Sequence, residues 1–362
     1  MLESSRHHWP EYLIEAAGLG MFMISACVFT VLVMHPASPL AHWVVDPLWK
    51  RAVIGVAMGL TAIALIYSPW GKQSGAHFNP SVTIAFYRLG KIAPADAFFY
   101  IVSQFTGAVA GVFICAVFLS HWISDPRVNY AVTSPGPHGV IAALISEFLI
   151  SFLLMLTVLV SSNVKRLAAF TGLFAGVLVA TYITIEAPLS GMSMNPARTF
   201  GSALPAHMWN DWWIYFLAPP VGMLAAAGIY VKLAGAQSVI CAKLHHGGNE
   251  RCIFRCGYRR VDPESNTEQR RKLPSGESSN QRRDPSGMMA ARTENQTMNL
   301  LKKLITIAIL TLPSLGASGS QSISEKKSLT LDGARKVIAA AEAYAKEHNA
   351  PQIWTHSSGF DT

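Results

Sequence analysis

The stretch SGAHFNPSVTIAFYRLG, residues 74–90, sets an Asn-Pro pair, Asn79 and Pro80, between two strongly apolar parts of the chain. Asn is among the best helix N-caps, and Pro is favoured in the first helical turn because its missing N–H loses no partner there. The pair therefore predicts a helix that starts here and continues through residues 82–89. Such a helix is too short to cross a lipid bilayer.

A second pair of the same kind, Asn195 and Pro196, lies in the stretch SGMSMNPARTFGSALP at residues 190–205. It predicts a second short helix that continues through residues 197–203. A single Asn-Pro pair usually marks an ordinary turn. Two pairs in similar surroundings indicate a repeated structural element instead.

The composition around these pairs is that of a membrane protein. Of the 362 residues, 51% are hydrophobic and 14% are charged, and the mean hydropathy is +0.31. The net charge of +8 is concentrated in residues 243–292, where it suits a cytoplasmic segment beside anionic lipid better than a nucleic-acid site. Six apolar runs are long enough to span the bilayer as helices: 12–34, 51–68, 97–119, 139–161, 168–185 and 213–234.

Basic residues gather in the connections on one side of these six runs. The second and fourth connections and the tail after the sixth run are rich in Lys and Arg, whereas the first, third and fifth connections are poor in them. By the positive-inside rule, both ends of the six-span part are cytoplasmic. The residues concerned are Lys72, Arg88 and Lys91 in the second connection and Lys165 and Arg166 in the fourth.

The two halves of the six-span part repeat one pattern. Each half reads as a span with a Glu, a second span, an Asn-Pro loop and a third span, with Glu15 and Glu147 in equivalent places. Because each unit has three spans, the second copy enters the membrane from the opposite face, which makes an inverted repeat. We expect Glu15 and Glu147 to accept hydrogen bonds from the backbone of the Asn-Pro loops. A proton relay is the alternative role for them.

An inverted repeat brings the two short helices into the membrane from opposite sides, so that they meet start to start. Irregular backbone is tolerated at that depth only where it is buried in protein or lines a water-filled cavity. An aqueous pore is the expected consequence. Two helix N-termini disfavour cations and protons there, and the amides of Asn79 and Asn195 can donate hydrogen bonds to a passing water or alcohol oxygen.

These residues resemble the aquaporins and glycerol facilitators, the major intrinsic protein family, in its bacterial-type members. The resemblance covers about residues 12–234 and rests on HFNPSVT, MNPART, the paired Glu and Gln104. It implies an all-α membrane protein of six transmembrane helices plus two re-entrant half-helices. It also implies a homotetramer in the inner membrane that passes water and small neutral solutes such as glycerol or urea, is not an enzyme and needs no cofactor. The pore motifs would be Asn79, Pro80 and Ser81, and Asn195, Pro196 and Ala197.

The same resemblance implies a selectivity filter of four residues: Met58 or the neighbouring Gly59, Ile183, Met192 and Arg198. Three positions depart from the family pattern. Water-selective members typically carry His where this chain has Ile183, and glycerol-type members usually carry Asp where it has Thr199. Ser81 stands where the common motif has Ala, a change that we expect to matter little. The filter therefore leaves the preferred solute open.

Two other classes of function remain compatible with six spans. A secondary transporter would move its solute by rocking the repeats, but it needs more buried charge for ion coupling than Glu15, Glu147 and Arg198 supply. A membrane scaffold without useful flux is the other alternative.

Beyond residue 236 the chain changes character. The stretch CAKLHHGGNERCIFRC, residues 241–256, gathers cysteines and histidines that could hold zinc, although the spacing is not that of a standard zinc finger. We expect reduced cysteines in a basic segment and assign no metal. The candidate ligands are Cys241, His245, Cys252 and Cys256, with His246 beside them.

We expect three parts: a channel part at 1–236, a basic and largely disordered cytoplasmic tail at 237–297, and a third part at 298–362. The third part begins with a segment that has the layout of a secretory signal peptide, at 298–321. The helix predicted after it looks like the start of a secreted haem-binding or haem-degrading domain. We interpret this arrangement as a gene junction, with a genuine fusion as the alternative.

Overall fold

The computed structural model describes residues 2–246 and 251–257. Within these ranges the only regular secondary structure is helix. The tail from residue 258 onward, the segment resembling a signal peptide and the helix predicted after it lie outside the described residues.

Six helices are long and apolar enough to cross a membrane, as the sequence predicts. Three begin earlier than expected. In α3 and α6 a proline occupies the first turn, and in α3 Asp46 also caps the helix by accepting hydrogen bonds from Leu48 N and Trp49 N, so the helix extends beyond its apolar core. The six are α1 (Leu2–Met34), α3 (Pro47–Tyr67), α6 (Pro94–Leu119), α8 (Gly139–Asn163), α9 (Thr171–Ile185) and α12 (Trp213–Ala234).

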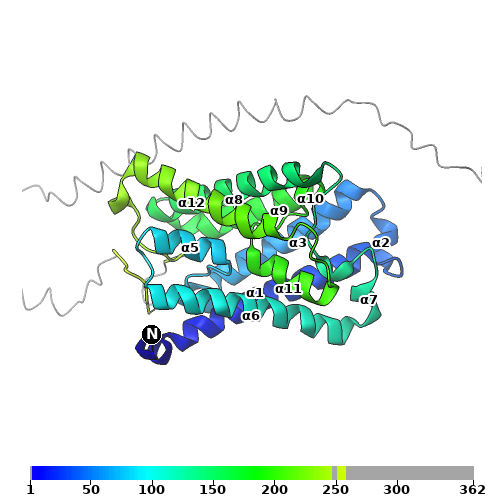
Figure 1. Ribbon diagram of the computed structural model, residues 1–362, viewed down its shortest axis with the longest axis horizontal. Coiled ribbons are helices and arrows are strands. Elements are labelled where there is room, and N and C mark those ends of the chain that lie inside the picture. Colours follow the sequence, from blue (N-terminus) through cyan, green and yellow to red (C-terminus); the bar gives the residue numbers. More distant parts are fainter. Residues whose placement is uncertain (1, 247–250, 258–362) are drawn as a thin grey trace, which may run out of the picture. The chain divides into compact units, whose positions relative to one another are not determined.

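Two short helices, α5 (Pro80–Arg88) and α11 (Pro196–Ala206), begin at the two prolines of the Asn-Pro pairs. They enter the bundle from opposite ends, as Figure 1 shows. We call the end that holds α5 and the start of α1 the tail end, and the end that holds α11 the opposite end. Shorter helices complete the connections: α2 (Pro39–Trp43), α4 (Pro69–Ser74), α7 (His121–Ser124) and α10 (Ala187–Ser190).

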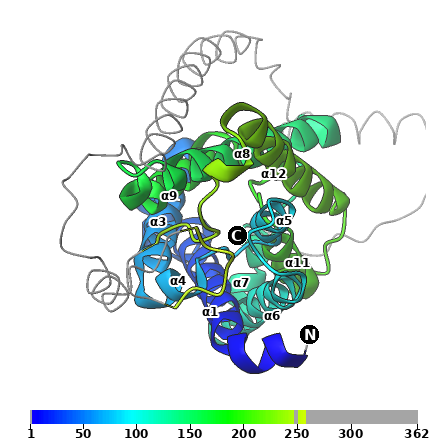
Figure 2. The same cartoon turned by 90° about the vertical axis from the view of Figure 1, so that its left-hand side faces the viewer.

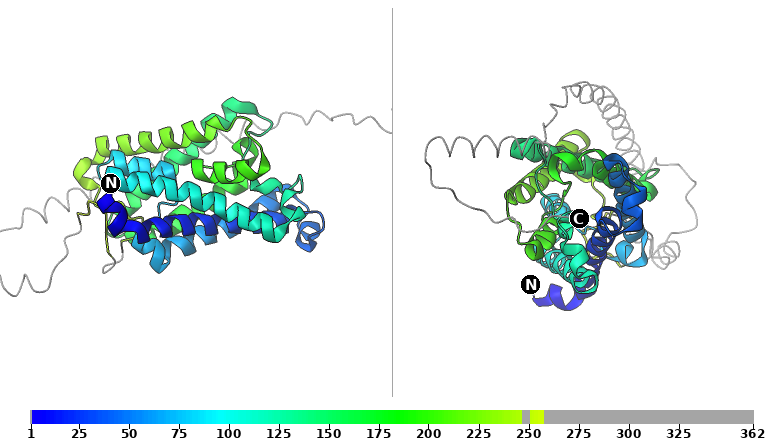
Figure 3. Two further views of the ribbon diagram at one scale, coloured as in Figure 1. Left: turned by 60° about the horizontal axis from the view of Figure 1, so that its bottom comes forward. Right: turned by 90° about the vertical axis from the view of Figure 1, so that its right-hand side faces the viewer.

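The packing follows the inverted repeat. Helix α1 packs on α6 in the first half, α8 packs on α12 in the second, and α3 meets α9 between the halves. Each short helix leans on the third span of the other half, α5 on α12 and α11 on α6. The helices thus form a ring around the two short ones, which the end-on view in Figure 3 shows.

Small residues allow the closest of these contacts. A methyl group added at Gly107 of α6 would lie only 2.0 Å from the carbonyl oxygen of Ala16 in α1, and one at Gly176 of α9 would lie 2.6 Å from that of Gly59 in α3. These glycines let helix backbones approach closely where hydrophobic burial cannot drive helix association.

After α12 the chain turns back over the tail end of the bundle. We call residues 236–246 and 251–257, the described part of this segment, the strap. Backbone hydrogen bonds tie it to the loop before α5 (Leu244 N to Gly75 O, 3.1 Å) and to Lys91 O (from Arg255 N, 2.9 Å). This segment was expected to belong to a largely disordered tail, but it is packed against the helices (Figure 2).

Candidate pore and selectivity filter

The two asparagines hold the tips of both re-entrant loops together. Each side-chain oxygen caps its own helix: Asn79 Oδ1 accepts from Ser81 N (2.8 Å), and Asn195 Oδ1 accepts from Ala197 N (3.0 Å). Each side-chain nitrogen donates to the other loop, Asn79 Nδ2 to Met194 O and Asn195 Nδ2 to Phe78 O, both at 2.8 Å. An amide nitrogen carries two N–H groups, so one on each Asn remains for another acceptor.

A buried carboxylate supports the loop before α11. Glu147 of α8 accepts hydrogen bonds from Ser190 Oγ (2.8 Å), Ser193 N (2.6 Å) and Met194 N (2.7 Å). Its side chain is fully buried. The carboxylate therefore takes the place of a partner strand or helix for backbone groups that would otherwise lack acceptors inside the bundle.

Glu15 of α1 does the same for the loop before α5. It accepts from Ser74 Oγ (2.8 Å), His77 N (3.0 Å) and Phe78 N (2.6 Å). Gln104 adds a fourth hydrogen bond from its Nε2 at 2.8 Å. The two carboxylates thus make equivalent contacts in the two halves of the repeat.

These hydrogen bonds hold both loops in an unusual backbone conformation. Three residues in each loop have positive φ, and only one of the three is a glycine, so the other two carry strain that the surrounding contacts must offset. The matching pairs are Gly75 and Gly191 (93° and 78°), Ala76 and Met192 (55° and 52°), and Phe78 and Met194 (45° and 55°).

Two tyrosines complete the support, and sequence reasoning missed them. Tyr100 donates its hydroxyl to Ser74 O (2.7 Å), and Tyr215 donates its hydroxyl to Ser190 O (2.5 Å). Both side chains are fully buried. Each tyrosine lies near the start of the third span of its repeat, and this matched placement is the signal that could have identified them.

One cavity of about 370 Å³ passes along the interior of the ring. Arg127 and Val128 line it towards the opposite end, Asn79 and Asn195 line its middle, and Leu244 of the strap lines it at the tail end. The cavity walls are mostly apolar. They also include all four predicted filter residues: Met58, Ile183, Met192 and Arg198.

The two candidates on α3 differ in the direction they face. Met58 lines the cavity and is almost fully buried. Gly59 faces α9 instead, where an added methyl group would lie 2.6 Å from Gly176 O. Of the two candidates, Met58 is therefore the one that lines the cavity.

Arg198, the fourth predicted filter residue, brings a charged group to the cavity wall. Its backbone N–H donates to Asn195 Oδ1 (3.2 Å), which fixes the start of the side chain at the cavity. Its Nη1 is buried and has no hydrogen-bond partner among the described residues. The guanidinium can therefore donate to an oxygen atom in the cavity, whose lining also includes the apolar side chains of Ile183, Met58 and Met192.

The two remaining departures from the family pattern have different surroundings. Thr199 bonds with Thr133 (Oγ1 to Oγ1, 2.8 Å) and Ser193 (Oγ1 to Oγ, 2.6 Å), so it joins the α11 loop to the segment before α8. Ser81 has a fully buried hydroxyl without a hydrogen-bond partner in the described part of the chain.

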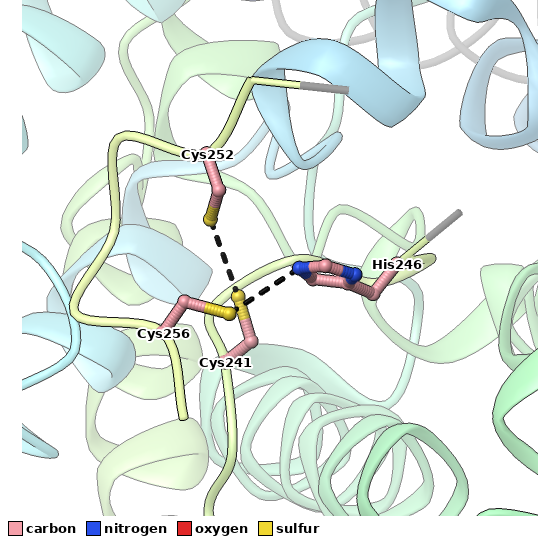
Figure 4. Close-up of side chains that lie close together, drawn as sticks. All are labelled: Cys241, His246, Cys252 and Cys256. Atoms are coloured by element: carbon pink, nitrogen blue, oxygen red, sulfur yellow. Dashed lines mark hydrogen bonds between the residues drawn. The ribbon is translucent and has the colours of Figure 1, made fainter. Parts of the chain in front are cut away.

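The strap gathers three cysteines and one histidine at the tail end of the bundle. Cys241, His246, Cys252 and Cys256 place one ligand atom each within 4.8 Å of all the others (Figure 4). The sequence-based set named His245, but that ring lies edge-on to Tyr67, with centroids 5.1 Å apart. The hydrogen bond from the Cys241 thiol, with His246 and Lys243 nearby, lowers the pKa of Cys252.

The sequence model of the major intrinsic protein family matches residues 2–230. The chain belongs to this family. It is similar to Aquaporin NIP2-3 of Zea mays, with 33% identity over 229 residues that cover 62% of this chain and 73% of the relative. It is also similar to the Probable aquaporin AqpM of Archaeoglobus fulgidus, with 37% identity over 188 residues that cover 50% of this chain and 76% of the relative.

A solved structure shares the fold. The aquaglyceroporin from Plasmodium falciparum aligns with a TM-score of 0.52 and 20% identity, over 63% of this chain and 98% of that one. At this level of identity the likeness is one of fold alone.

Proposed function

We propose that this protein is a passive membrane channel for water and small neutral solutes that excludes ions and protons. The proposal rests above all on one observation. The N-termini of α5 and α11, with Asn79 and Asn195, meet at a single cavity whose wall also carries Arg198.

The Asn pair suits a water file. Each amide has one N–H tied to the other loop, so the second N–H keeps a fixed direction and can donate to a water oxygen. The positive ends of two helix dipoles act at the same place and raise the energy of a cation there. Arg198 adds a full positive charge to the wall, which repels cations further.

The filter suits a solute with both polar and apolar sides. Arg198 can donate to a hydroxyl or carbonyl oxygen, while Ile183, Met58 and Met192 contact carbon. Methionine side chains are flexible and adapt to different shapes. We therefore propose that glycerol-sized or urea-sized neutral molecules pass as well as water.

We further propose that the channel is a homotetramer in the inner membrane of a bacterial cell, with the tail end in the cytoplasm. The basic loops support this orientation. Lys72 lies in α4, Arg88 is the last residue of α5, and Lys165 and Arg166 follow α8, all at the tail end.

The direct test is light scattering of proteoliposomes in a stopped-flow instrument, with osmotic gradients of sucrose for water flux and of glycerol or urea for solute flux. A channel gives faster volume change than empty vesicles, linear in the gradient and indifferent to Na⁺ or H⁺ gradients. Permeability equal to that of empty vesicles would reject the channel. Saturable flux coupled to an ion gradient would indicate a transporter.

The filter is tested with Ile183→His. The imidazole narrows the cavity and puts a polar group on a wall that was apolar. One changed wall contact is worth about 1–3 kcal/mol, so we expect glycerol flux to fall roughly tenfold relative to water flux. The matched control is Ile185→His, which alters an exposed residue at the end of the same helix. Equal effects of the two variants on glycerol flux would contradict the assignment of Ile183 to the filter.

A further inference from the structure

The strap lies at the tail end of the cavity, where its side chains pack on the loop before α5. The Phe254 ring stacks on His77, with centroids 5.4 Å apart, and lies edge-on to Tyr100 at 6.0 Å. The carbonyl of Ala242 accepts from His77 Nε2 at 2.8 Å. Leu244 lines the cavity itself. The strap therefore contacts the same loop that carries Asn79.

The strap consists of two segments, which we call limbs, and few direct hydrogen bonds join them. The first, residues 236–246, contains one short 3₁₀ turn at Ala236–Ser238; the second, residues 251–257, has no helix or strand. One direct backbone hydrogen bond between the limbs joins Gly257 N to Ile240 O at 2.8 Å, and Lys243 Nζ donates to Arg251 O at 2.7 Å. Ordering a segment of this kind costs about 1–2 kcal/mol per residue in backbone entropy.

The four sulfur and nitrogen atoms lie where the two limbs meet. Cys241 and His246 come from the first limb, and Cys252 and Cys256 come from the second (Figure 4). Cys241 Sγ lies 3.6 Å from Cys252 Sγ, and Cys256 Sγ lies 3.2 Å from His246 Nε2. A tetrahedral zinc ion with ordinary bond lengths separates two sulfur ligands by about 3.8 Å and a sulfur from a nitrogen by about 3.5 Å.

The chemistry of the donors selects the metal. Three thiolates and one imidazole form a soft set that suits Zn²⁺ and not Ca²⁺ or Mg²⁺, which take oxygen ligands. Three thiolates and Zn²⁺ leave one net negative charge. Lys243 is buried next to the second limb and holds its ammonium group at Arg251 O. This cation offsets the charge.

We propose that Cys241, His246, Cys252 and Cys256 bind one Zn²⁺ ion, which fastens the strap across the tail end of the cavity. The bound ion joins the two limbs through four bonds, so its binding energy holds the strap in place. If the protein conducts as proposed above, the zinc-bound strap restricts flux at this end and loss of zinc raises it.

The first test is the metal content of the purified full-length chain, measured by mass spectrometry of the metal after preparation with thiol reductant and without chelator. We expect about one Zn²⁺ per chain, and tetrahedral thiolate absorption after replacement by Co²⁺. A metal-free protein that also gives no such absorption on titration with Co²⁺ would overturn the proposal. A Cys241–Cys252 disulfide that persists in the presence of the thiol reductant and leaves no site for metal would also overturn it.

Variants assign the ligands. Cys252→Ser and His246→Ala should weaken Zn²⁺ binding by more than the roughly 10- to 100-fold that loss of an outer-shell partner costs. His245→Ala is the matched control, because its ring packs on Tyr67, and it should retain zinc. The opposite result, with His245→Ala losing zinc and His246→Ala keeping it, would refute the assignment. Each variant is compared at equal monodispersity in detergent, so misfolding is detected separately.

Flux measurements with the same preparations separate this proposal from the proposed channel. Zinc binding can be measured whether or not the protein conducts. A chain that binds zinc but conducts neither water nor solute would support the metal site and contradict the proposed channel. Equal flux with and without zinc would support the channel and contradict the proposal that the zinc-bound strap restricts flux. We expect Cys252→Ser to show faster water flux than the parent chain.

Discussion

In both Asn79 and Asn195, the oxygen and the nitrogen of the side-chain amide bond to different loops. The oxygen is used locally, within its own helix cap, and the nitrogen is used across the molecule, on a carbonyl of the other loop. A Gln could not cap the helix in this way because its longer side chain misplaces the oxygen, and an Asp would lack the donor. The chemistry of the site thus depends on the residue type down to single atoms.

At the same scale, Glu147→Gln should destabilise the loop before α11. The change replaces one acceptor oxygen with a donor that faces Ser193 N, Met194 N or Ser190 Oγ, and hydrogen bonds to a charged group are worth about 1.5–3 kcal/mol each. We expect a loss of about 3 kcal/mol, measured as a lower thermal transition of tryptophan fluorescence in detergent. Tyr215→Phe removes one neutral hydrogen bond to Ser190 O and should cost only about 1 kcal/mol. Equal losses for the two variants would contradict the supporting role of the carboxylate.

Ser81→Ala is predicted to act in the other direction. The hydroxyl is fully buried and has no hydrogen-bond partner within the described ranges, so its removal relieves an uncompensated desolvation cost of about 1–3 kcal/mol. We expect a higher thermal transition and unchanged water flux. Ser202→Ala, which removes a buried hydroxyl that bonds to Arg198 O and Thr199 O, is the control and should not stabilise the protein. A lower transition for Ser81→Ala would mean that the hydroxyl has an acceptor after all.

At the scale of elements, α5 and α11 are stable although each is too short to be an independent helix. Three kinds of contact stabilise them: their N-caps, the carboxylates that hold their loops, and packing on the third span of the other repeat. The strap is held in a similar way: it has one short 3₁₀ turn, and hydrogen bonds to Gly75, Lys91 and Asn163 hold it against the bundle.

Phe254→Ala should therefore loosen the strap without touching its metal ligands. The ring is nearly buried between His77 and Tyr100, and truncating a buried Phe costs about 3–5 kcal/mol. We expect faster exchange of the backbone amides of the strap with deuterium, and faster water flux if the strap restricts the channel. Phe118→Ala, on the exposed side of α6, is the matched control. Unchanged exchange at Leu244 and Arg255 would show that Phe254 does not anchor the strap.

At the scale of the whole molecule, the two halves of the repeat share their support but not their detail. Equivalent hydrogen bonds in the two halves are made by three pairs of residues: Glu15 and Glu147, Ser74 and Ser190, and Tyr100 and Tyr215. Among the described residues, the first half alone has a Gln, Gln104, on its carboxylate, and the strap lies at the tail end, where it bonds to the loop before α5 and to Asn163 of α8. The ends of the pore therefore differ although the middle is nearly symmetric.

The proposed homotetramer is also a property of this scale. In mild detergent, light scattering coupled to size exclusion should report a protein mass near four times the 39.3 kDa of one chain, after subtraction of the detergent. The same mass should be found for Ile183→His, because the filter faces the cavity and not a neighbouring chain. A protein mass of one chain at all concentrations would exclude a stable tetramer.

By itself, the sequence determined the six spans, the inverted repeat and the starts of α5 and α11, because apolar run length, charge in the loops and helix capping are local properties of the chain. The tertiary structure alone decided that Met58 and not Gly59 meets the cavity, that His246 and not His245 joins the cysteines, and that the strap covers the tail end. It also revealed the hydrogen bonds from each Asn to the other loop and the two supporting tyrosines. The physical reason is the same in every case: these features depend on which residues far apart in the chain come within hydrogen-bond or ligand distance, and no local pattern specifies that.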